Sequence, residues 1–267
     1  MTESLVLIGV GLLAGILAGF LGIGGGTVMV PVMVALGLSA VKAVGTSSLA
    51  ILIIALGGSW QNWRMGLLNL NNALLLGLPA IATAFLGTAL ASSFPEYVLL
   101  GVFGLFMLFN IYLLRVKQQV VAGAQSQSLS EGKITPQAPK PTQSRLLIGG
   151  TAGFMAGLFG VGGGVVMVPL QIILLQEEIK VAIQTSLGAI VITSLSALGW
   201  HAIEGHVEGW IGLLLGLGGL AGVQVGTRYL PRLASQKVTL MFRVVLALFA
   251  MFFFYKAWQS FIALRVV

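Results

Sequence analysis

The chain has 267 residues, of which 57% are hydrophobic and only 8% are charged. A water-soluble domain carries roughly 25% charged residues, so this composition excludes a soluble globule and indicates an integral membrane protein. The net charge of +7 predicts no nucleic-acid partner here, because the Lys and Arg residues lie mainly between apolar runs, where they set orientation in the lipid bilayer.

Apolar runs follow one another in two sets of five. They lie at roughly 5–21, 27–38, 43–59, 71–92 and 96–114, and then at 145–160, 164–176, 181–199, 209–227 and 238–258. Such continuous runs are typical of membrane helices rather than barrel strands. We therefore expect an all-α polytopic membrane protein with about 8–10 membrane segments. The Gln-, Ser- and Pro-rich stretch 115–144 predicts a flexible cytoplasmic linker between a first transmembrane repeat at 1–114 and a second at 145–267.

A glycine-rich motif occurs once in each half. GFLGIGGGTVMVP, from Gly19 to Pro31, returns as GLFGVGGGVVMVP, from Gly157 to Pro169. Glycine costs about 1 kcal/mol relative to alanine at a helix position, so three in a row predict a broken helix. Lipid cannot satisfy the freed backbone groups, which must be covered by protein or face a water-filled cavity. Matched breaks in two halves indicate a transport site.

The two halves align with a nearly constant difference in residue number. Gly22 pairs with Gly160 at a difference of 138, and Gly87 pairs with Gly226 at a difference of 139. We therefore place one inserted residue near 64–66. Two-repeat architecture is common among secondary transporters.

The run at 27–38 has two interpretations. Its 12 residues make roughly 18 Å of helix, too short for a hydrocarbon core of about 30 Å. The first two runs form either a hairpin or one broken crossing. The hairpin places more of the Lys and Arg residues on the linker side. It also gives each half an odd number of crossings. We therefore predict two inverted-topology repeats, each a glycine-broken helix hairpin plus three transmembrane helices, with both termini outside.

The glycine breaks are the first candidate substrate site. A helix that restarts after three glycines presents unpaired N–H groups and the positive end of its dipole, which suits an anion. The alternative is tight helix packing, which small residues allow. The predicted substrate-binding residues are Gly24, Gly25, Gly26 and Thr27 in the first half, and Gly162, Gly163 and Gly164 in the second.

Hydroxyl and amide side chains begin the next apolar run in each half and extend this candidate site. The constant difference pairs Thr46 with Gln184, Ser47 with Thr185, and Ser48 with Ser186. These groups could bind the substrate, or they could cap helices and bond between them. Because Gln184 replaces a hydroxyl, the two halves need not contribute equally.

Five further residues are candidates for gating or coupling: Lys42, Gln61, Asn62, Lys180 and His201. The alternative for each lysine is snorkelling to the headgroups. His201 belongs to a titratable cluster with Glu204, His206 and Glu208. This cluster contains no histidine pair at i, i+4. We therefore expect a solvated outer loop and no metal, although proton coupling through His201 and metal binding remain open alternatives.

Several kinds of chemistry are missing from the sequence. No apolar run contains Asp, and no Glu falls at mid-membrane, which argues against a cation substrate and a carboxylate proton relay. There is no phosphate-binding GxxxxGK[ST] loop and no nucleophile–base pair in register. We therefore expect neither an enzyme nor a cofactor.

The paired GxLGIGGG-x-x-x-x-P and GxFGVGGG-x-x-x-x-P motifs, each followed by a lysine and a TS-containing stretch, resemble the sulfite exporter TauE/SafE family of membrane permeases. The resemblance covers both halves. It implies a bacterial-type inner-membrane transporter of sulfur-containing anions such as sulfite or organosulfonates. We expect a secondary transporter with alternating access around the breaks. Two alternatives are an anion channel and a non-transport membrane assembly partner.

Overall fold

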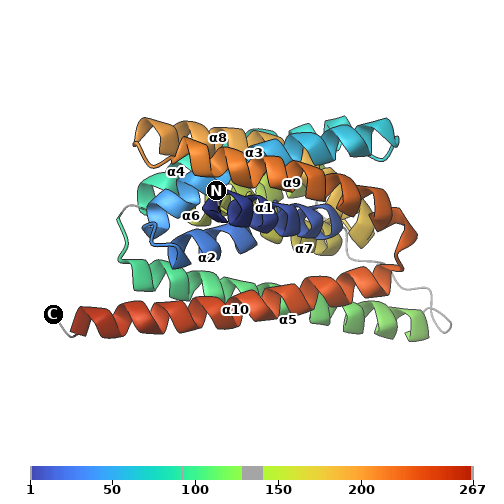
Figure 1. Cartoon of the computed structure of the whole chain (residues 1–267). Helices are drawn as coiled ribbons and strands as arrows, with labels where there is room; N and C mark the ends of the chain where they lie inside the picture. Colours follow the sequence, from blue (N-terminus) through green and yellow to red (C-terminus); the bar gives the residue numbers. More distant parts are fainter. Residues whose placement is uncertain (1, 92, 128–140, 266–267) are drawn as a thin grey trace.

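The computed structural model describes residues 2–91, 93–127 and 141–265. These residues form ten α-helices and one short 3₁₀ turn (Figure 1). The first half contains α1 (Thr2–Leu21), α2 (Gly26–Ala35), α3 (Ala40–Arg64), α4 (Leu70–Ala91) and α5 (Glu96–Gln127). The second half contains α6 (Pro141–Phe159), α7 (Gly164–Leu174), α8 (Ile179–Ile203), α9 (Gly209–Tyr229), the turn η1 (Leu230–Arg232) and α10 (Ser235–Arg265).

The all-helical fold expected from composition is confirmed. Six helices are long and apolar enough to cross a membrane: α1, α3, α4, α8, α9 and α10. Shorter apolar stretches lie in α2, α7 and residues 97–112 of α5. Helix α6 begins with the polar sequence PTQSR, which lowers its hydropathy. At the predicted linker, α5 continues to Gln127 and α6 begins at Pro141, and residues 128–140 lie outside the described part of the chain.

Helices α1 and α2 form a hairpin rather than one broken crossing. Helix α2 begins beside the middle of α1, because a Cβ added to Gly25 would lie 3.1 Å from the carbonyl oxygen of Ala14. Its C-terminal end returns to the start of α1, where Met33 and Leu36 share a surface hollow with Glu3. Helices α6 and α7 repeat this turn. The hairpin interpretation is therefore confirmed.

The first helix of each half packs against the other half. Helix α1 packs along α9 of the second half, and α6 packs along α4 of the first, while α3 lies against α8 and α5 lies beside α10 (Figure 1). Glycines allow the close approaches. A Cβ added to Gly11 would overlap the backbone of Leu215, and one added to Gly149 would overlap the backbone of Leu76. These two glycines therefore allow helices to pack closely, as small residues do between membrane helices.

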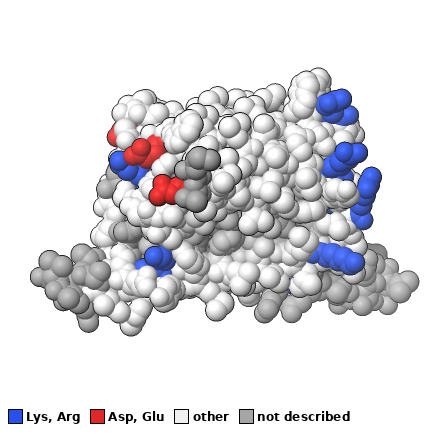
Figure 2. Space-filling view, viewed as in Figure 1, with Lys and Arg blue, Asp and Glu red and all other residues white. Residues whose placement is uncertain are grey.

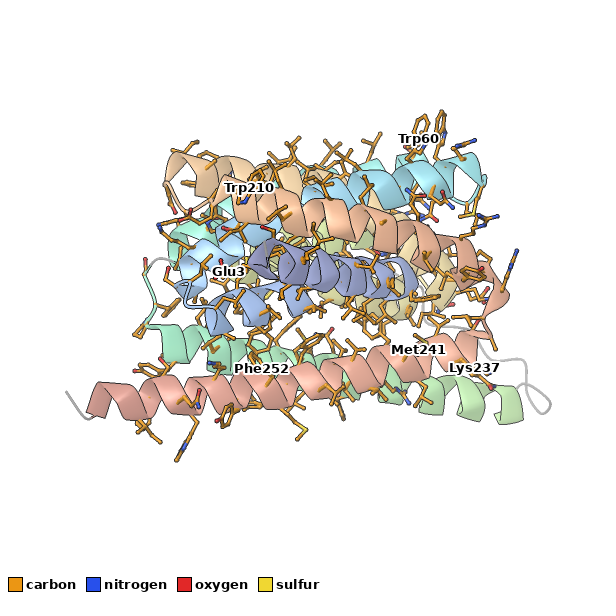
Figure 3. The ribbon with its side chains drawn as sticks, viewed as in Figure 1. Glu3, Trp60, Trp210, Lys237, Met241 and Phe252 are labelled. Carbon is orange, nitrogen blue, oxygen red and sulfur yellow. The ribbon has the colours of Figure 1, made fainter. Side chains whose placement is uncertain are left out.

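The two hairpins reach the centre of the bundle from opposite ends. The open end of the α1–α2 hairpin lies beside Trp210 at the start of α9. The α7–α8 turn lies at the far end of α9, where Lys180 Nζ donates to Pro231 O over 3.1 Å. Figure 2 shows most visible Lys and Arg side chains near this second end and the visible acidic side chains near the first. Figure 3 labels Glu3 and Lys237 at these two ends.

Buried apolar clusters surround the breaks on both sides. One cluster joins α5, α6 and α10, where Phe103 stacks on Phe159 with 4.4 Å between ring centroids and meets Phe253 edge-on at 4.6 Å. A second cluster includes Met29 of α2 and Ile51 of α3. The breaks are therefore covered by protein, as freed backbone groups in a membrane require.

Candidate substrate site at the glycine breaks

The two glycine breaks touch each other at the centre of the fold. A Cβ added to Gly26 would overlap the carbonyl oxygen of Gly160, and one added to Gly164 would overlap the carbonyl oxygen of Gly22. Only glycine allows two backbones to approach this closely. Segments 138 residues apart in the sequence therefore form one symmetric contact.

Each short helix begins with a backbone turn that favours glycine. Gly25 precedes α2 with φ of 80°, and Gly163 precedes α7 with φ of 77°. Both lie in the left-handed region, where a Cβ is unfavourable. Neither helix start has a side-chain cap. The sequence therefore builds the same N-terminal turn twice.

The first N–H groups after these turns have no partner within their own helix. The first backbone bonds of α2 run from Val28 and Met29 to Gly25 O, over 3.1 and 3.2 Å. The N–H groups of Gly26 and Thr27 precede them and have no carbonyl partner within the helix. The same holds at the start of α7, where Val166 and Met167 donate to Gly163 O. All of these residues except Val28 are buried, so two dry helix N-termini lie at the centre of the protein.

Two buried serines close the contact between the breaks. Ser47 Oγ of α3 donates to Gly160 O over 2.8 Å. Ser186 Oγ of α8 donates to Gly22 O over 3.1 Å. Each hydroxyl therefore reaches a carbonyl group in the break of the other half. Each also lies within hydrogen-bond distance of a carbonyl of its own helix, Val44 O at 2.8 Å and Ile183 O at 2.9 Å, so its single proton is shared between two acceptors.

The serine contacts correct the predicted pairing of the two halves. Ser47 and Ser186 occupy equivalent places although their numbers differ by 139, since 186 − 47 = 139. The pairing of Ser47 with Thr185 is therefore wrong, as is the position of the insertion near 64–66. The extra residue lies in α7, which has 11 residues where α2 has 10. Thr185 corresponds to Thr46, and Gln184 does not replace a hydroxyl.

Within the described residues, the other polar side chains predicted to bind substrate form no hydrogen bond to the glycine breaks. Thr46 Oγ1 accepts from the Glu208 N–H over 3.0 Å, and Ser48 Oγ donates to Val44 O over 3.1 Å within α3. Thr27 is buried, and its Oγ1 has no hydrogen-bond partner among the described residues. Thr185 and Gln184 are also buried. Thr46 thus joins α3 to the residue that precedes α9, whereas the bond of Ser48 lies within α3.

The five gating candidates do not gather at the breaks. Lys42 Nζ lies 2.8 Å from Glu208 Oε1 at one end of the bundle, whereas Lys180 lies at the other. Asn62 is fully buried near the end of α3, and neither of its amide atoms has a partner in the described structure. Gln61, beside it, is half-buried.

His201 corrects the expectation of a solvated outer loop. Its side chain is fully buried, and its Nε2 lies 3.2 Å from Gly157 O of α6. Glu204 and His206 are partly exposed beside it. The end of α8 is therefore attached to the helix that leads into the second break.

Burial also affects a carboxyl group at the opposite end of the bundle. Desolvation raises the pKa of Glu177, in the α7–α8 turn, and the charge of Arg145 partly opposes this rise. Neither group lies at the breaks, so the central contact is free of these charges.

Comparison with known proteins identifies the family. A family model described as "Sulfite exporter TauE/SafE" matches residues 7–253. The chain belongs to the TauE/SafE family. It is 26% identical to the "Probable membrane transporter protein YunE" of Bacillus subtilis, over 91% of this chain and 94% of that protein. It is 27% identical to a "Probable membrane transporter protein" of Xylella fastidiosa, over 97% of this chain and 98% of that one. No solved structure gives a significant match.

The TauE/SafE match and these relatives identify a multi-pass membrane transporter. The resemblance based on the two glycine motifs is thus confirmed at the level of the family. The central contact of this TauE/SafE chain offers backbone N–H and hydroxyl donors. Such a donor set suits an anion better than a cation.

Sequence reasoning missed three residues of the site. Ile51 and Ile190 each contact both breaks, since Cβ atoms added to Gly24 and Gly162 would lie 3.0 to 3.6 Å from their Cγ2 atoms. Thr193 Oγ1 donates to Gly162 O over 2.9 Å. Ile190 and Thr193 lie four and seven residues after Ser186, on one face of α8. Their helical spacing from Ser186 was the sequence signal that could have identified Ile190 and Thr193.

Proposed function

We propose that this protein is a secondary transporter of a small sulfur-containing anion, such as sulfite or an organosulfonate, in a bacterial-type inner membrane. The observation that carries the proposal is a pair of buried helix N-termini, those of α2 and α7, each packed against the glycine break of the other half. Their dipoles favour negative charge by about 0.3–2 kcal/mol each, depending on burial.

Binding through neutral donors fits transport. An anion held by N–H and hydroxyl groups is attracted without a fixed positive charge, so it can also leave. Among the described residues, the nearest neighbours of the break glycines are glycine, alanine, serine, threonine, valine and isoleucine. None of these nearest neighbours carries a carboxylate, which would repel an anion.

Alternating access follows from the contact between the breaks. When they touch, the Ser47 and Ser186 hydroxyls donate to carbonyl oxygens across the contact. Movement of one hairpin away from the other breaks these two bonds. The Ser47 and Ser186 hydroxyls, which also lie 2.8 Å from Val44 O and 2.9 Å from Ile183 O, then face the substrate. Because the hairpins enter from opposite ends, such movement opens the centre toward one side of the membrane at a time.

The charge distribution supports an orientation. The end of the bundle with Lys180 and Lys237 is rich in basic side chains (Figures 2 and 3). Basic loops face the cytoplasm in most membrane proteins. The linker is then cytoplasmic, both termini lie outside, and the two repeats are inverted in the membrane. A membrane potential that is negative inside drives anions outward in this arrangement.

Thermal stability of the purified protein with different anions tests the binding step. The panel contains sulfite, sulfate, thiosulfate, sulfoacetate, taurine, chloride and a carboxylate. A ligand of the folded state stabilises it by about 2.7 kcal/mol at a hundredfold excess over Kd. We expect one sulfur oxyanion to raise the melting temperature selectively. Equal melting temperatures with every anion, up to the highest concentration that the protein tolerates, would contradict binding at the breaks.

A further inference from the structure

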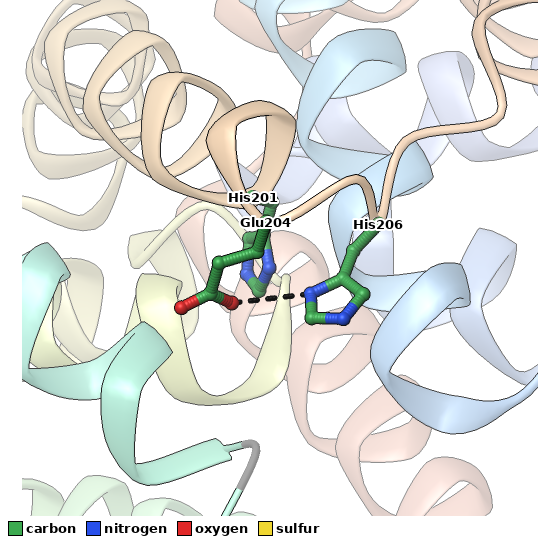
Figure 4. Close-up of side chains that lie close together, drawn as sticks. All are labelled: His201, Glu204 and His206. Carbon is green, nitrogen blue, oxygen red and sulfur yellow. Dashed lines mark ion pairs between the residues drawn. The ribbon is translucent and has the colours of Figure 1, made fainter.

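Three metal-ligand side chains meet at the end of α8, away from the glycine breaks. One nitrogen of His201, one nitrogen of His206 and a carboxylate oxygen of Glu204 all lie within 4.8 Å of one another (Figure 4). His201 and His206 are the two histidines of the chain. Both are therefore in this cluster.

A helix-ending turn brings the histidines together. Gly205 follows α8 with φ of 72°, and its N–H donates to Ala202 O over 3.1 Å. The His206 N–H donates to His201 O over 2.9 Å. These two bonds define a Schellman turn, which places the side chains of its first and last residues beside each other. Apolar residues usually occupy both places, but here two imidazoles do, with 6.2 Å between their centroids.

The buried histidine is oriented as a metal ligand. Its Nε2 lies 3.2 Å from Gly157 O, and because a carbonyl only accepts, Nε2 carries the proton. Nδ1 then has a free lone pair. This atom is buried and has no hydrogen-bond partner among the described residues. A ligating histidine typically donates its other N–H to a carbonyl or carboxylate, which fixes its ring in this way.

The other two ligands are accessible from solution. Glu204 Oε2 lies 3.1 Å from His206 Nδ1, and the two side chains are 36% and 27% exposed. They can therefore rotate toward an ion and bring their ligand atoms to about 2 Å from it. The nearby Lys42 is paired with Glu208 at 2.8 Å, so its positive charge is compensated.

We propose that His201, Glu204 and His206 bind a divalent transition-metal ion of the Zn²⁺ class. Two imidazoles and one carboxylate are a common zinc ligand set, with water in the fourth position. The ion would attach the α8–α9 turn to α6 through His201 and Gly157. This proposal differs from the expectation of no metal and does not depend on the transported substrate.

The first half of the chain contains a matched turn without these ligands. Gly66 N–H donates to Trp63 O over 3.0 Å, and Leu67 N–H donates to Asn62 O over 2.9 Å, which repeats the turn after α8. Asn62, Met65 and Leu67 occupy the places of His201, Glu204 and His206. A turn of this kind therefore forms with Asn, Met and Leu at the three positions. For this reason H201N, E204M and H206L are suitable substitutions for testing the metal site.

The test is Zn²⁺ binding to the full chain without an affinity tag, measured by titration calorimetry and by metal content after dialysis. We expect one Zn²⁺ per chain. The surface variant E204M/H206L should bind at least about 100-fold more weakly, because loss of an outer-shell partner alone lowers affinity 10- to 100-fold. The control variant E3Q removes an exposed carboxylate at the same end of the bundle and should bind like the parent.

The same proteins are then heated with and without Zn²⁺. The ion should raise the melting temperature of the parent and of E3Q but not that of E204M/H206L, while all three melt alike in zinc-free buffer. Absence of zinc uptake by the parent, or equal uptake by E204M/H206L, would overturn the proposal. H201N serves as a second variant, and its gel-filtration profile shows whether the buried substitution is tolerated.

Discussion

Gly164 is the residue where the symmetric contact leaves the least space. A Cβ there would overlap the carbonyl group of Gly22, and neither backbone can move without disturbing a break. We expect Gly164→Ala to lower stability by about 1–3 kcal/mol, as overpacking does. Gly9→Ala is the control, because a Cβ at Gly9 meets nothing within 4 Å and alanine favours a helix.

The measurement is the melting temperature of each variant in detergent. Gly9→Ala should match or exceed the parent, whereas Gly164→Ala should melt lower. Equal melting temperatures for the two variants would mean that the breaks are not packed against each other as described.

The two helix breaks could be predicted from the sequence, because three glycines in a row make a poor helix. The partners of Ser47 and Ser186 could not be predicted. Their pairing depends on one extra residue within α7, and an apolar run gives no internal mark of where a residue was inserted. The same error made Gln184 look like a break in the symmetry.

At the scale of elements, α3 and α8 hold the breaks through two equivalent hydroxyls. Loss of one buried hydrogen bond costs about 0.5–1.5 kcal/mol, so Ser47→Ala and Ser186→Ala should each lower the melting temperature slightly. If these hydroxyls bind the anion after the breaks separate, the variants should also lose affinity for the sulfur oxyanion. Ser48→Ala is the matched control, because its hydroxyl donates to Val44 O within α3.

Anion titrations of the three serine variants separate the two roles. The account predicts weaker binding in Ser47→Ala and Ser186→Ala and unchanged binding in Ser48→Ala. If all three variants bind like the parent, the serines have only a structural role.

The hairpins could be predicted from the shortness of the runs after the glycines and from the distribution of charge. The Schellman turns after α3 and α8 were missed, although Gly66 and Gly205 each lie one residue beyond the C-terminal cap position that follows the helix, Met65 after α3 and Glu204 after α8. A search for histidines four residues apart assumes that the helix continues. The turn at Gly205 instead brings together residues five apart, which is why the cluster around His201 looked like a solvated loop.

At the scale of the whole molecule, composition and length predicted the membrane class, and the repeated motif predicted two similar halves. The packing of α1 against the second half and of α6 against the first half could not be predicted. These helices are apolar and glycine-rich on several faces, so their sequences do not indicate which neighbour they contact. The packing partner is decided by the fit of backbone to backbone, as at Gly11 and Gly149.

The proposed orientation predicts which end of the molecule is exposed on each side of a cell. The chain contains no cysteine, so single substitutions can be labelled without background. Lys42→Cys should react with an impermeant thiol reagent added outside intact cells, and Lys237→Cys should react only after permeabilisation. The reverse pattern would place the basic end outside and contradict the orientation.

The most direct test of the account is flux of ³⁵S-labelled sulfite into proteoliposomes preloaded with unlabelled sulfite. A carrier with alternating access gives saturable exchange, and the account predicts that Ser186→Ala reduces this exchange while Ser48→Ala does not. A large sulfite conductance without saturation would identify a channel instead. Absence of exchange for sulfite and for every other sulfur oxyanion of the panel would contradict the claim that the glycine breaks carry such anions.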